Sequence, residues 1–358
     1  MIAVQSSQQS NIAVLLLAHG TPDTIDEIPE YLKNVVSGRA IPQSVVEEIQ
    51  HRYAQIGKSP LTEWTMRQAE LLQEKISMPV YVGMRNWKPY IAETVAKMRA
   101  DGVTSAVALC MAPQNSRTSV GLYRRAAYAE AGGALRFQFI DAWADHPRLI
   151  DAFAVRLRPV WLQASQQYGG KVPVVFTAHS VPCRTIQTQP AEQHVSPPAH
   201  PPISNAGPVR PTAPERSYAL PANAPRDPDP YAAEAKQTAA VVAERLVPDG
   251  LTCQDWYFAF QSQGASGGPW IGPTVEDTLQ ALHQAGHHSV VLQPIGFLCD
   301  HVEILYDIDI AFQQFAQKLG MKLFRPKSLN DSPLLIEALA ELASTGLAQL
   351  QDAAQKTA

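Results

Sequence analysis

The sequence predicts an α/β protein made of two similar halves, each built from parallel βα units. Two observations support this fold class. Short apolar runs alternate with longer segments of helical periodicity along most of the chain. The pattern also starts again midway, because "NIAVLLLAHGTP" and "KVPVVFTAHSVP" each combine a buried strand with Ala-His, a small residue and a nearby proline. We therefore expect two α/β units that follow one another in the sequence.

Eight apolar runs are predicted to be strands, with helices between them. One helix is expected at Leu61–Lys75. Another is expected at Ile91–Asp101, where Val95 and Met98 lie at roughly helical spacing and the Asp-Gly pair marks the end. The predicted strands are Ile12–Leu17, Pro79–Gly83, Ser105–Met111, Arg136–Ile140, Val172–Thr177, Asp255–Phe260, Ser289–Pro294 and Lys322–Phe324.

This order of elements predicts two domains. Residues 11–145 form the first, and the C-terminal segment 330–352 is expected to pack back on it through the helix Pro333–Leu350. Residues 146–329 form the second. Within it, residues 187–230 hold twelve of the 29 prolines and almost no aliphatic periodicity, so we expect this Pro-rich insertion to be an exposed, flexible loop.

The composition is that of an ordinary globular chain, since 46% of the 358 residues are hydrophobic and 17% are charged. A net charge of -4 argues against nucleic acid as a partner. No stretch approaches the length of a transmembrane helix, and "MIAVQSSQQSN" lacks the basic start of a secretory signal, so we expect a cytoplasmic protein. Its scattered cysteines are expected to be reduced: Cys110, Cys183, Cys253 and Cys299.

Three histidines follow strand-like runs, at the carboxyl ends where open parallel sheets bind ligands. They are His19, His179 and His301. One such histidine alone is more often a packing or capping residue, but three at equivalent strand ends favour a functional site. His179, in "FTAHSVP", is expected on the turn after its strand, where a fixed backbone suits a metal ligand or proton acceptor.

The run "CDHVEILYD" places a thiol, an imidazole and three carboxylates within nine residues. Asp300 can cap the helix that follows. His301 and Glu303 are two apart and are expected on different helix faces, whereas Glu303 and Asp307 are four apart and share one face. The spacing from Cys299 to His301 does not match a zinc site. The run therefore predicts a line of two carboxylates.

Two loop regions add further candidates. The Gly-rich "QSQGASGGPWIGP" lacks the lysine of a nucleotide-phosphate cradle, and its Trp270 either offers a flat surface or packs a rigid turn. The segments "RYAQIGKSPL" and "APQNSRTSVGLYRR" contribute Arg52, Ser59 and Tyr123, which could bind an anionic ligand, while Arg124 is as typical of a solvated helix face.

Taken together, these stretches resemble the ferrochelatase family. The motifs are "RYAQIGKSPL", "GMRNWKPYI", "FTAHSVP", "QSQGASGGPWIGP" and "PIGFLCDHVEILYDID", in family order over nearly the whole chain. The resemblance implies two Rossmann-like, chelatase-type domains with parallel four-stranded sheets and a porphyrin cleft between them. It implies a lyase of haem biosynthesis that inserts ferrous iron into a porphyrin and releases two protons. "AHGTP" and the length of the Gly-rich loop are most similar to the bacterial enzymes that use coproporphyrin III.

The family's metal-facing pair corresponds to His179 and Glu303. A neutral imidazole and a carboxylate on opposite sides of the ring could share iron delivery and removal of the pyrrole protons. Residues that match positions in contact with the porphyrin and its propionates are Arg52, Tyr53, Ser59 and Tyr123. Four residues are expected to surround and support the pair: Asp300, His301, Asp307 and Trp270.

Three positions depart from the family pattern. His19 stands where coproporphyrin-type relatives usually have tyrosine, and we expect it to approach iron from the other face. A propionate-binding arginine is replaced by Val36 or Ser37, so that Arg39 would have to compensate. The acidic line ends at Ala311, and we therefore expect neither an auxiliary metal site nor a relay beyond the cleft.

Alternatives remain open for the substrate and the activity. The porphyrin could be protoporphyrin IX, or the protein could load another tetrapyrrole or another metal such as cobalt. In a different class, it could be a non-catalytic haem- or porphyrin-binding protein that uses His19 as a ligand. We expect a monomer without a prosthetic group or iron–sulfur cluster, whose partners are the porphyrin, ferrous iron and a downstream haem-synthesis enzyme.

Overall fold

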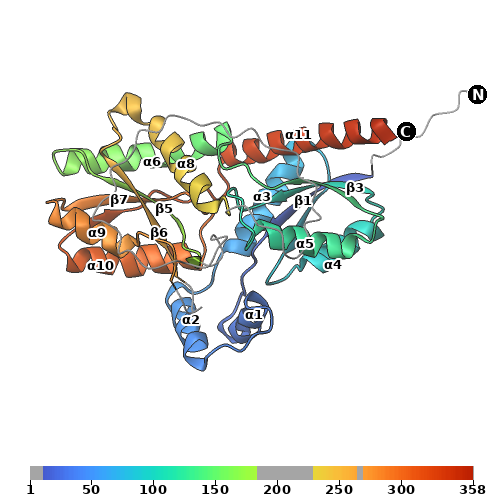
Figure 1. The fold of residues 1–358 in the computed structure, drawn as a ribbon, viewed down its shortest axis with the longest axis horizontal. Coiled ribbons are helices and arrows are strands. Elements are labelled where there is room, and N and C mark those ends of the chain that lie inside the picture. Colours follow the sequence, from blue (N-terminus) through green and yellow to red (C-terminus); the bar gives the residue numbers. More distant parts are fainter. Residues whose placement is uncertain (1–10, 184–228, 264–268, 358) are drawn as a thin grey trace, which may run out of the picture.

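The computed structural model describes residues 11–183, 229–263 and 269–357, which form two α/β halves side by side (Figure 1). Each half contains one four-stranded sheet in which all strand pairings are parallel. The first sheet consists of β1 (Ile12–Ala18), β2 (Val80–Met84), β3 (Ser105–Cys110) and β4 (Arg136–Ile140). The second consists of β5 (Val174–His179), β6 (Trp256–Gln261), β7 (Ser289–Pro294) and β8 (Lys322–Phe324).

The strand orders, β2-β1-β3-β4 and β6-β5-β7-β8, are the same topology used twice. The first strand of each half therefore lies inside its sheet, where both faces are covered. This position explains its continuous apolar sequence, such as the buried "AVLLLA" of β1. The fold class, the internal repeat and all eight strands predicted from the sequence are confirmed.

One strand boundary bears on the site. β5 begins two residues later than predicted and continues to His179, which pairs with Gln261 at the end of β6. The expectation that His179 lies on the turn after the strand is therefore wrong. The β5–β6 ladder runs to this residue, and the next N–H, of Ser180, still donates to the Gln261 carbonyl at 2.6 Å.

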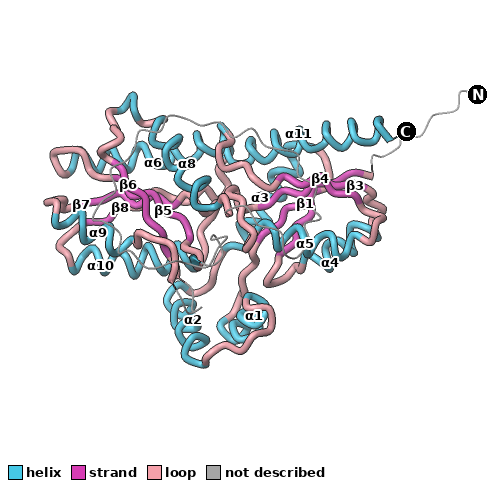
Figure 2. Tube along the Cα trace, viewed as in Figure 1, coloured by secondary structure: helices cyan, strands magenta, loops and turns pink. Residues whose placement is uncertain are grey.

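Helices cover both faces of the sheets (Figure 2). On the first half, α11 (Pro333–Thr357) packs against β3, β4 and α3 (Leu61–Ile76). Other helices around the sheets are α4 (Ile91–Ala100), α5 (Val120–Ala131), α6 (Pro147–Gln167), α8 (Tyr231–Glu244), α9 (Val275–Gln284) and α10 (Gln313–Lys318). No helix in the described ranges is both long and apolar enough to cross a bilayer.

One apolar core joins the halves. It includes Trp161 of α6, Phe176 of β5 and Leu339 of α11, all buried. Each large apolar side chain buried in this way contributes about 2 kcal/mol. The two sheets are therefore held by shared packing and not by a linker alone, which fixes the distance between their carboxyl ends.

Two helices project from the sheets between the halves: α1 (Ile28–Val35) and α2 (Gln43–Ile56) (Figure 1). Their own small core contains Tyr31, Tyr53 and Trp87, and Val302 of the second half packs against it. Although α1 and α2 belong to the first half by sequence, they thus form part of the junction with the second.

Two further expectations concern the Pro-rich insertion and the cysteines. The Pro-rich insertion 187–230 lies outside the described residues apart from Asp229 and Pro230. All four cysteines are free, and Cys110 and Cys299 are buried.

Candidate functional site

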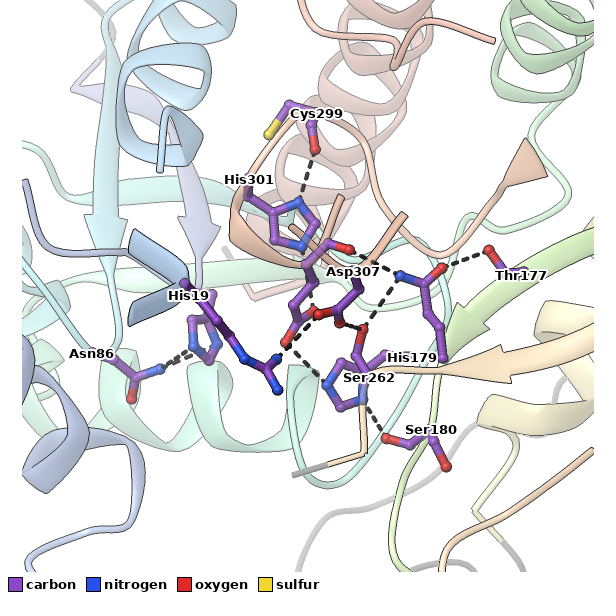
Figure 3. A network of polar contacts seen from close by, with 12 residues as sticks. His19, Asn86, Thr177, His179, Ser180, Ser262, Cys299, His301 and Asp307 are labelled. Carbon is purple, nitrogen blue, oxygen red and sulfur yellow. Dashed lines mark hydrogen bonds and ion pairs between the residues drawn. The ribbon is translucent and has the colours of Figure 1, made fainter. Parts of the chain in front are cut away.

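The carboxyl ends of β1 and β5 bring together residues from both halves (Figure 3). His179 is the last residue of β5, and His19 follows β1. Glu303 is the first residue of the π-helix η3 (Glu303–Phe312), which begins after the loop that follows β7. The strand-end histidines singled out in the sequence therefore do lie in one region, together with His301.

The Glu303 carboxylate lies between two imidazoles. Its Oε1 is 3.1 Å from His179 Nε2, and its Oε2 is 3.3 Å from His301 Nε2. The expectation that His301 and Glu303 lie on different helix faces is wrong, because His301 precedes the helix and its backbone is not helical. On the far side of each ring, His301 Nδ1 lies 3.0 Å from the Cys299 carbonyl, and His179 Nδ1 bonds the Ser180 carbonyl.

Charge fixes the protonation of this pair. Burial disfavours the imidazolium, but the charge and hydrogen bond of Glu303 raise the pKa of His179 to about 9. Burial likewise opposes ionisation of Glu303, yet the neighbouring histidines hold its pKa well below the usual range. The raised pKa of His179 and the lowered pKa of Glu303 favour an imidazolium beside a carboxylate at neutral pH, whereas the sequence led us to expect a neutral imidazole.

The same contact revises the placement of the pair around the substrate. A porphyrin ring cannot lie between two atoms that are 3.1 Å apart. The expectation that a flat ring lies between His179 and Glu303 does not fit this direct contact. His19 belongs to the first half and lies apart from the pair (Figure 3).

His19 is an uncharged imidazole. The Tyr31 hydroxyl lies 3.0 Å from its Nε2, and the Asn86 side-chain nitrogen lies 3.1 Å from its ring nitrogens. Burial lowers the pKa of His19 to about 4, against the attraction of Glu303 and with the repulsion of Arg85. A neutral ring keeps a lone pair, which a metal ligand requires.

Asp307 stands one turn after Glu303 and is held from two sides. Arg52 Nη1 lies 3.1 Å from its Oδ1, and the Ser262 hydroxyl bonds its Oδ2. Burial, helped by the charge of Glu303 and opposed by Ser262 and Arg52, raises the pKa of Asp307 to about 6. The predicted line of carboxylates is present, and Arg52, which is predicted to contact the porphyrin, is ion-paired with its second member.

Several buried polar atoms of the first half lack a hydrogen-bond partner among the described residues. They include the Thr21 hydroxyl and the side-chain oxygen of Asn86, while the buried hydroxyls of Tyr53 and Ser59 interact with one another. Buried polar groups are rarely left unpaired in a folded protein, so these atoms are candidates to bind a ligand or a water molecule. Tyr53 and Ser59 are both predicted to contact the porphyrin, and Tyr123 is buried nearby beside Arg85.

Asp300 and Trp270, which are also predicted to support the pair, make different contacts. Asp300 does not cap η3, whose N-cap is Val302; its carboxylate accepts from Ser328 at 2.6 Å and Asn330 at 2.9 Å and so fixes a neighbouring loop. The Trp270 ring lies 6.5 Å from the His179 ring, centroid to centroid, and can limit its movement.

Arg85 is a functional candidate that sequence reasoning missed. It is half-buried, interacts electrostatically with Tyr31, Tyr123 and His19, and has no carboxylate partner in the described ranges. The signal was available, since Arg85 lies within "GMRNWKPYI", but no single residue of that motif was singled out. Arg39, by contrast, is exposed and donates to the Val36 carbonyl at 3.0 Å.

Comparison with known proteins places these residues in context. A family model described as Ferrochelatase matches residues 11–347. A protein named Ferrochelatase from Acidobacterium capsulatum is 60% identical over 96% of this chain and 97% of its own length. One named Coproporphyrin III ferrochelatase, from Geobacillus thermodenitrificans, is 31% identical over 96% of this chain and 98% of its own.

Solved structures agree on the fold. The sirohydrochlorin chelatase SirB from Bacillus subtilis subspecies spizizenii, in complex with cobalt, superposes with a TM-score of 0.50. The match covers 94% of both chains at 10% sequence identity. At that identity the likeness concerns the chelatase-type arrangement of the two halves and not the substrate.

Proposed function

The chain belongs to the ferrochelatase family, enzymes that insert metal into a porphyrin, and we propose that its own porphyrin is coproporphyrin III. Coproporphyrin III carries four propionates and protoporphyrin IX carries two. The former therefore needs more positive charge around its rim. A relative named Coproporphyrin III ferrochelatase supports this choice.

Arg85 is the observation on which the proposal rests. Among the described residues it is a half-buried guanidinium without a carboxylate partner, beside His19 and Tyr123. Arginine binds carboxylates through two parallel hydrogen bonds, and burial strengthens them. A propionate is the anion that this position suits, and the buried hydroxyls of Tyr53 and Ser59 can bind the same rim.

On the metal side, we propose that His179 and Glu303 receive ferrous iron and that the two pyrrole protons leave one after the other through Glu303 to water. Glu303 is ionised and can accept a proton directly. His179 is already protonated, and its own proton passes to water when the cation binds, because a metal and a proton compete for the same nitrogen. Its Nδ1–H is bound to the Ser180 carbonyl, which leaves Nε2 as the nitrogen that faces the substrate.

We further propose that His19 approaches the iron from the opposite face of the ring. Its neutral state supports this role, since the lone pair is available at any physiological pH. Asn86 and Tyr31 hold the ring, so it would approach with little loss of side-chain entropy.

The substrate choice is tested by an anaerobic iron-insertion assay with coproporphyrin III and protoporphyrin IX in parallel. We expect the larger kcat/KM with coproporphyrin III. Replacing Arg85→Ala should raise KM for coproporphyrin III about tenfold and change KM for protoporphyrin IX less. Equal or greater kcat/KM with protoporphyrin IX would overturn the assignment of substrate while leaving the family unaffected.

A further inference from the structure

We propose that Tyr231 is a positioning residue for His179, and that Asp229 fixes Tyr231 against the first half of the molecule. The inference rests on the proposed role of His179 in metal delivery. Tyr231 begins α8, immediately after Asp229 and Pro230, and neither Asp229 nor Tyr231 was considered a site residue from the sequence.

The Tyr231 hydroxyl donates to the backbone carbonyl of His179 at 2.9 Å. Tyr231 is 8% exposed, so water does not readily replace this bond. Burial raises the pKa of Tyr231, which keeps the hydroxyl protonated and able to donate. The hydroxyl makes its hydrogen bond with the His179 carbonyl, and the Glu303 carboxylate acts on it through its charge, so we expect its effect on the imidazole to pass through the peptide bond that follows His179.

That peptide bond is held at both ends. Its carbonyl oxygen, on His179, accepts from Tyr231, and its N–H, on Ser180, donates to the Gln261 carbonyl at 2.6 Å. The orientation of this plane determines where the Ser180 carbonyl points. That carbonyl in turn binds His179 Nδ1–H and so aims the imidazole. Without the Tyr231 hydroxyl, the His179 carbonyl loses its hydrogen bond. The peptide plane is then held at one end only, and the His179 ring that faces Glu303 becomes more mobile.

Asp229 ties this arrangement to the first half. Its Oδ1 accepts from the Tyr231 N–H at 3.1 Å, and its Oδ2 accepts from the Arg117 N–H at 2.9 Å. The Ser116 hydroxyl lies 3.3 Å from the same Oδ2. The Asp229 side chain is 1% exposed. One buried carboxylate thus joins the loop before α5, the helix that carries Tyr123, to the residue that holds His179.

A second contact in the same place strengthens the connection. Glu234, one turn along α8, accepts from the Asn115 N–H at 2.6 Å. Asp229, just before α8, and Glu234, in its first turn, therefore bind three consecutive residues of the loop 115–117 through their carboxylates. Movement of this loop when a porphyrin binds near Tyr123 would act on Tyr231 and, through it, on the direction of the imidazole.

The test compares Tyr231→Phe with wild type in the full chain. The matched control is Tyr81→Phe, which removes a tyrosine hydroxyl hydrogen bond of 2.7 Å, to Asp101, on the outer side of the first half. We expect Tyr231→Phe to lower kcat for iron insertion about tenfold and to leave the porphyrin KM within about twofold. Tyr81→Phe should change neither.

A spectroscopic measurement separates positioning from general damage. The Nδ1–H proton of His179 should give a downfield resonance because of its bond to Ser180, and Tyr231→Phe should shift it upfield. Asp229→Asn keeps the tyrosine. It should also lower kcat and shift the resonance upfield, but by less than Tyr231→Phe does. This variant carries the test if Tyr231→Phe does not fold.

The outcomes of the two measurements are distinct. If wild type inserts no iron into either porphyrin, the proposed function fails, and the resonance alone decides on Tyr231. If wild type is active, and Tyr231→Phe retains both its kcat and the resonance position, the positioning role is overturned. A rise in porphyrin KM at constant kcat would also overturn it, since that result would place Tyr231 in substrate binding.

Discussion

Arg52 of α2 lies 3.1 Å from Asp307 of the π-helix, so a helix of the first half is ion-paired with the second half beside the site. The same guanidinium binds Glu48 at 3.0 Å and lies 5.0 Å above the Tyr306 ring. Arg52 therefore fastens α2 in its position at the junction, whatever contact it also makes with a substrate.

Replacing Arg52→Ala should loosen α2. Because a partly exposed ion pair contributes about 1 kcal/mol, we expect amide hydrogen exchange in residues 43–56 to accelerate about fivefold. The porphyrin KM should rise with a smaller change in kcat. Arg67→Ala is the control, since Arg67 pairs with Glu70 at 3.0 Å on an exposed helix surface away from this junction. Unchanged exchange in α2 would show that the pair does not hold the helix.

Asp307 should make folding stability depend on pH. Its pKa is raised from 3.8 to about 6, so the folded protein holds this proton more tightly than the unfolded chain does. The resulting stability is complete below pH about 4 and is lost as the pH rises through about 6. Asp307→Asn keeps the neutral state, and should raise the free energy of unfolding at pH 8 by at most about 3 kcal/mol.

Denaturant unfolding at pH 4.5 and pH 8 measures this effect. The gain from Asp307→Asn should be large at pH 8 and small at pH 4.5. Asp101→Asn is a control of opposite sign, because hydrogen bonds from Lys97 and Tyr81 lower the pKa of Asp101, so its replacement should lower stability at pH 8. A gain that is equal at both pH values would contradict the raised pKa of Asp307.

Glu303→Gln and His179→Ala should each reduce iron insertion at least about 100-fold while the fold is retained. The first removes the proton acceptor and the charge that raises the pKa of His179. Insertion rates and thermal melting measured on the same samples test both parts. Glu337→Gln, which removes an exposed carboxylate of α11 that pairs with Arg148, should remain fully active. Near-normal turnover in either site variant would show that the roles are wrongly assigned.

His19→Ala should change the absorbance spectrum of the bound product more than it changes the rate of iron insertion. Without the imidazole, the absorbance spectrum of the protein with its iron porphyrin should lose the signature of a nitrogen axial ligand, while insertion continues. His146→Ala serves as the comparison, since His146 lies 3.5 Å from Glu341 of α11 and faces no substrate. Identical spectra for His19→Ala and wild type would exclude His19 as a ligand in that complex.

The sequence was sufficient for the fold because the apolar runs of buried parallel strands are continuous and separated by clear helical patterns. It also placed His179 and His19 at strand ends that the topology brings to one region. Their position at the carboxyl ends of parallel strands is enough to indicate a site, without knowledge of any contact.

Contacts between distant segments could not be predicted in this way. Arg52 and Asp307 are 255 positions apart, and the Tyr231 hydroxyl meets a backbone carbonyl, which leaves no mark in a side-chain pattern. The error over His301 had a local cause, because helical periodicity was applied to a residue that precedes the helix. Glu303 begins a π-helix, and His301, two residues earlier, lies outside it.

The ion pair of His179 and Glu303 also affects the folding stability of the protein when iron is scarce. A buried carboxylate left without a counter-charge would favour unfolding, as happens in proteins whose metal is part of their structure. Here a proton on the imidazole neutralises Glu303 whenever the metal is missing. We therefore expect folding of this protein not to depend on the supply of iron.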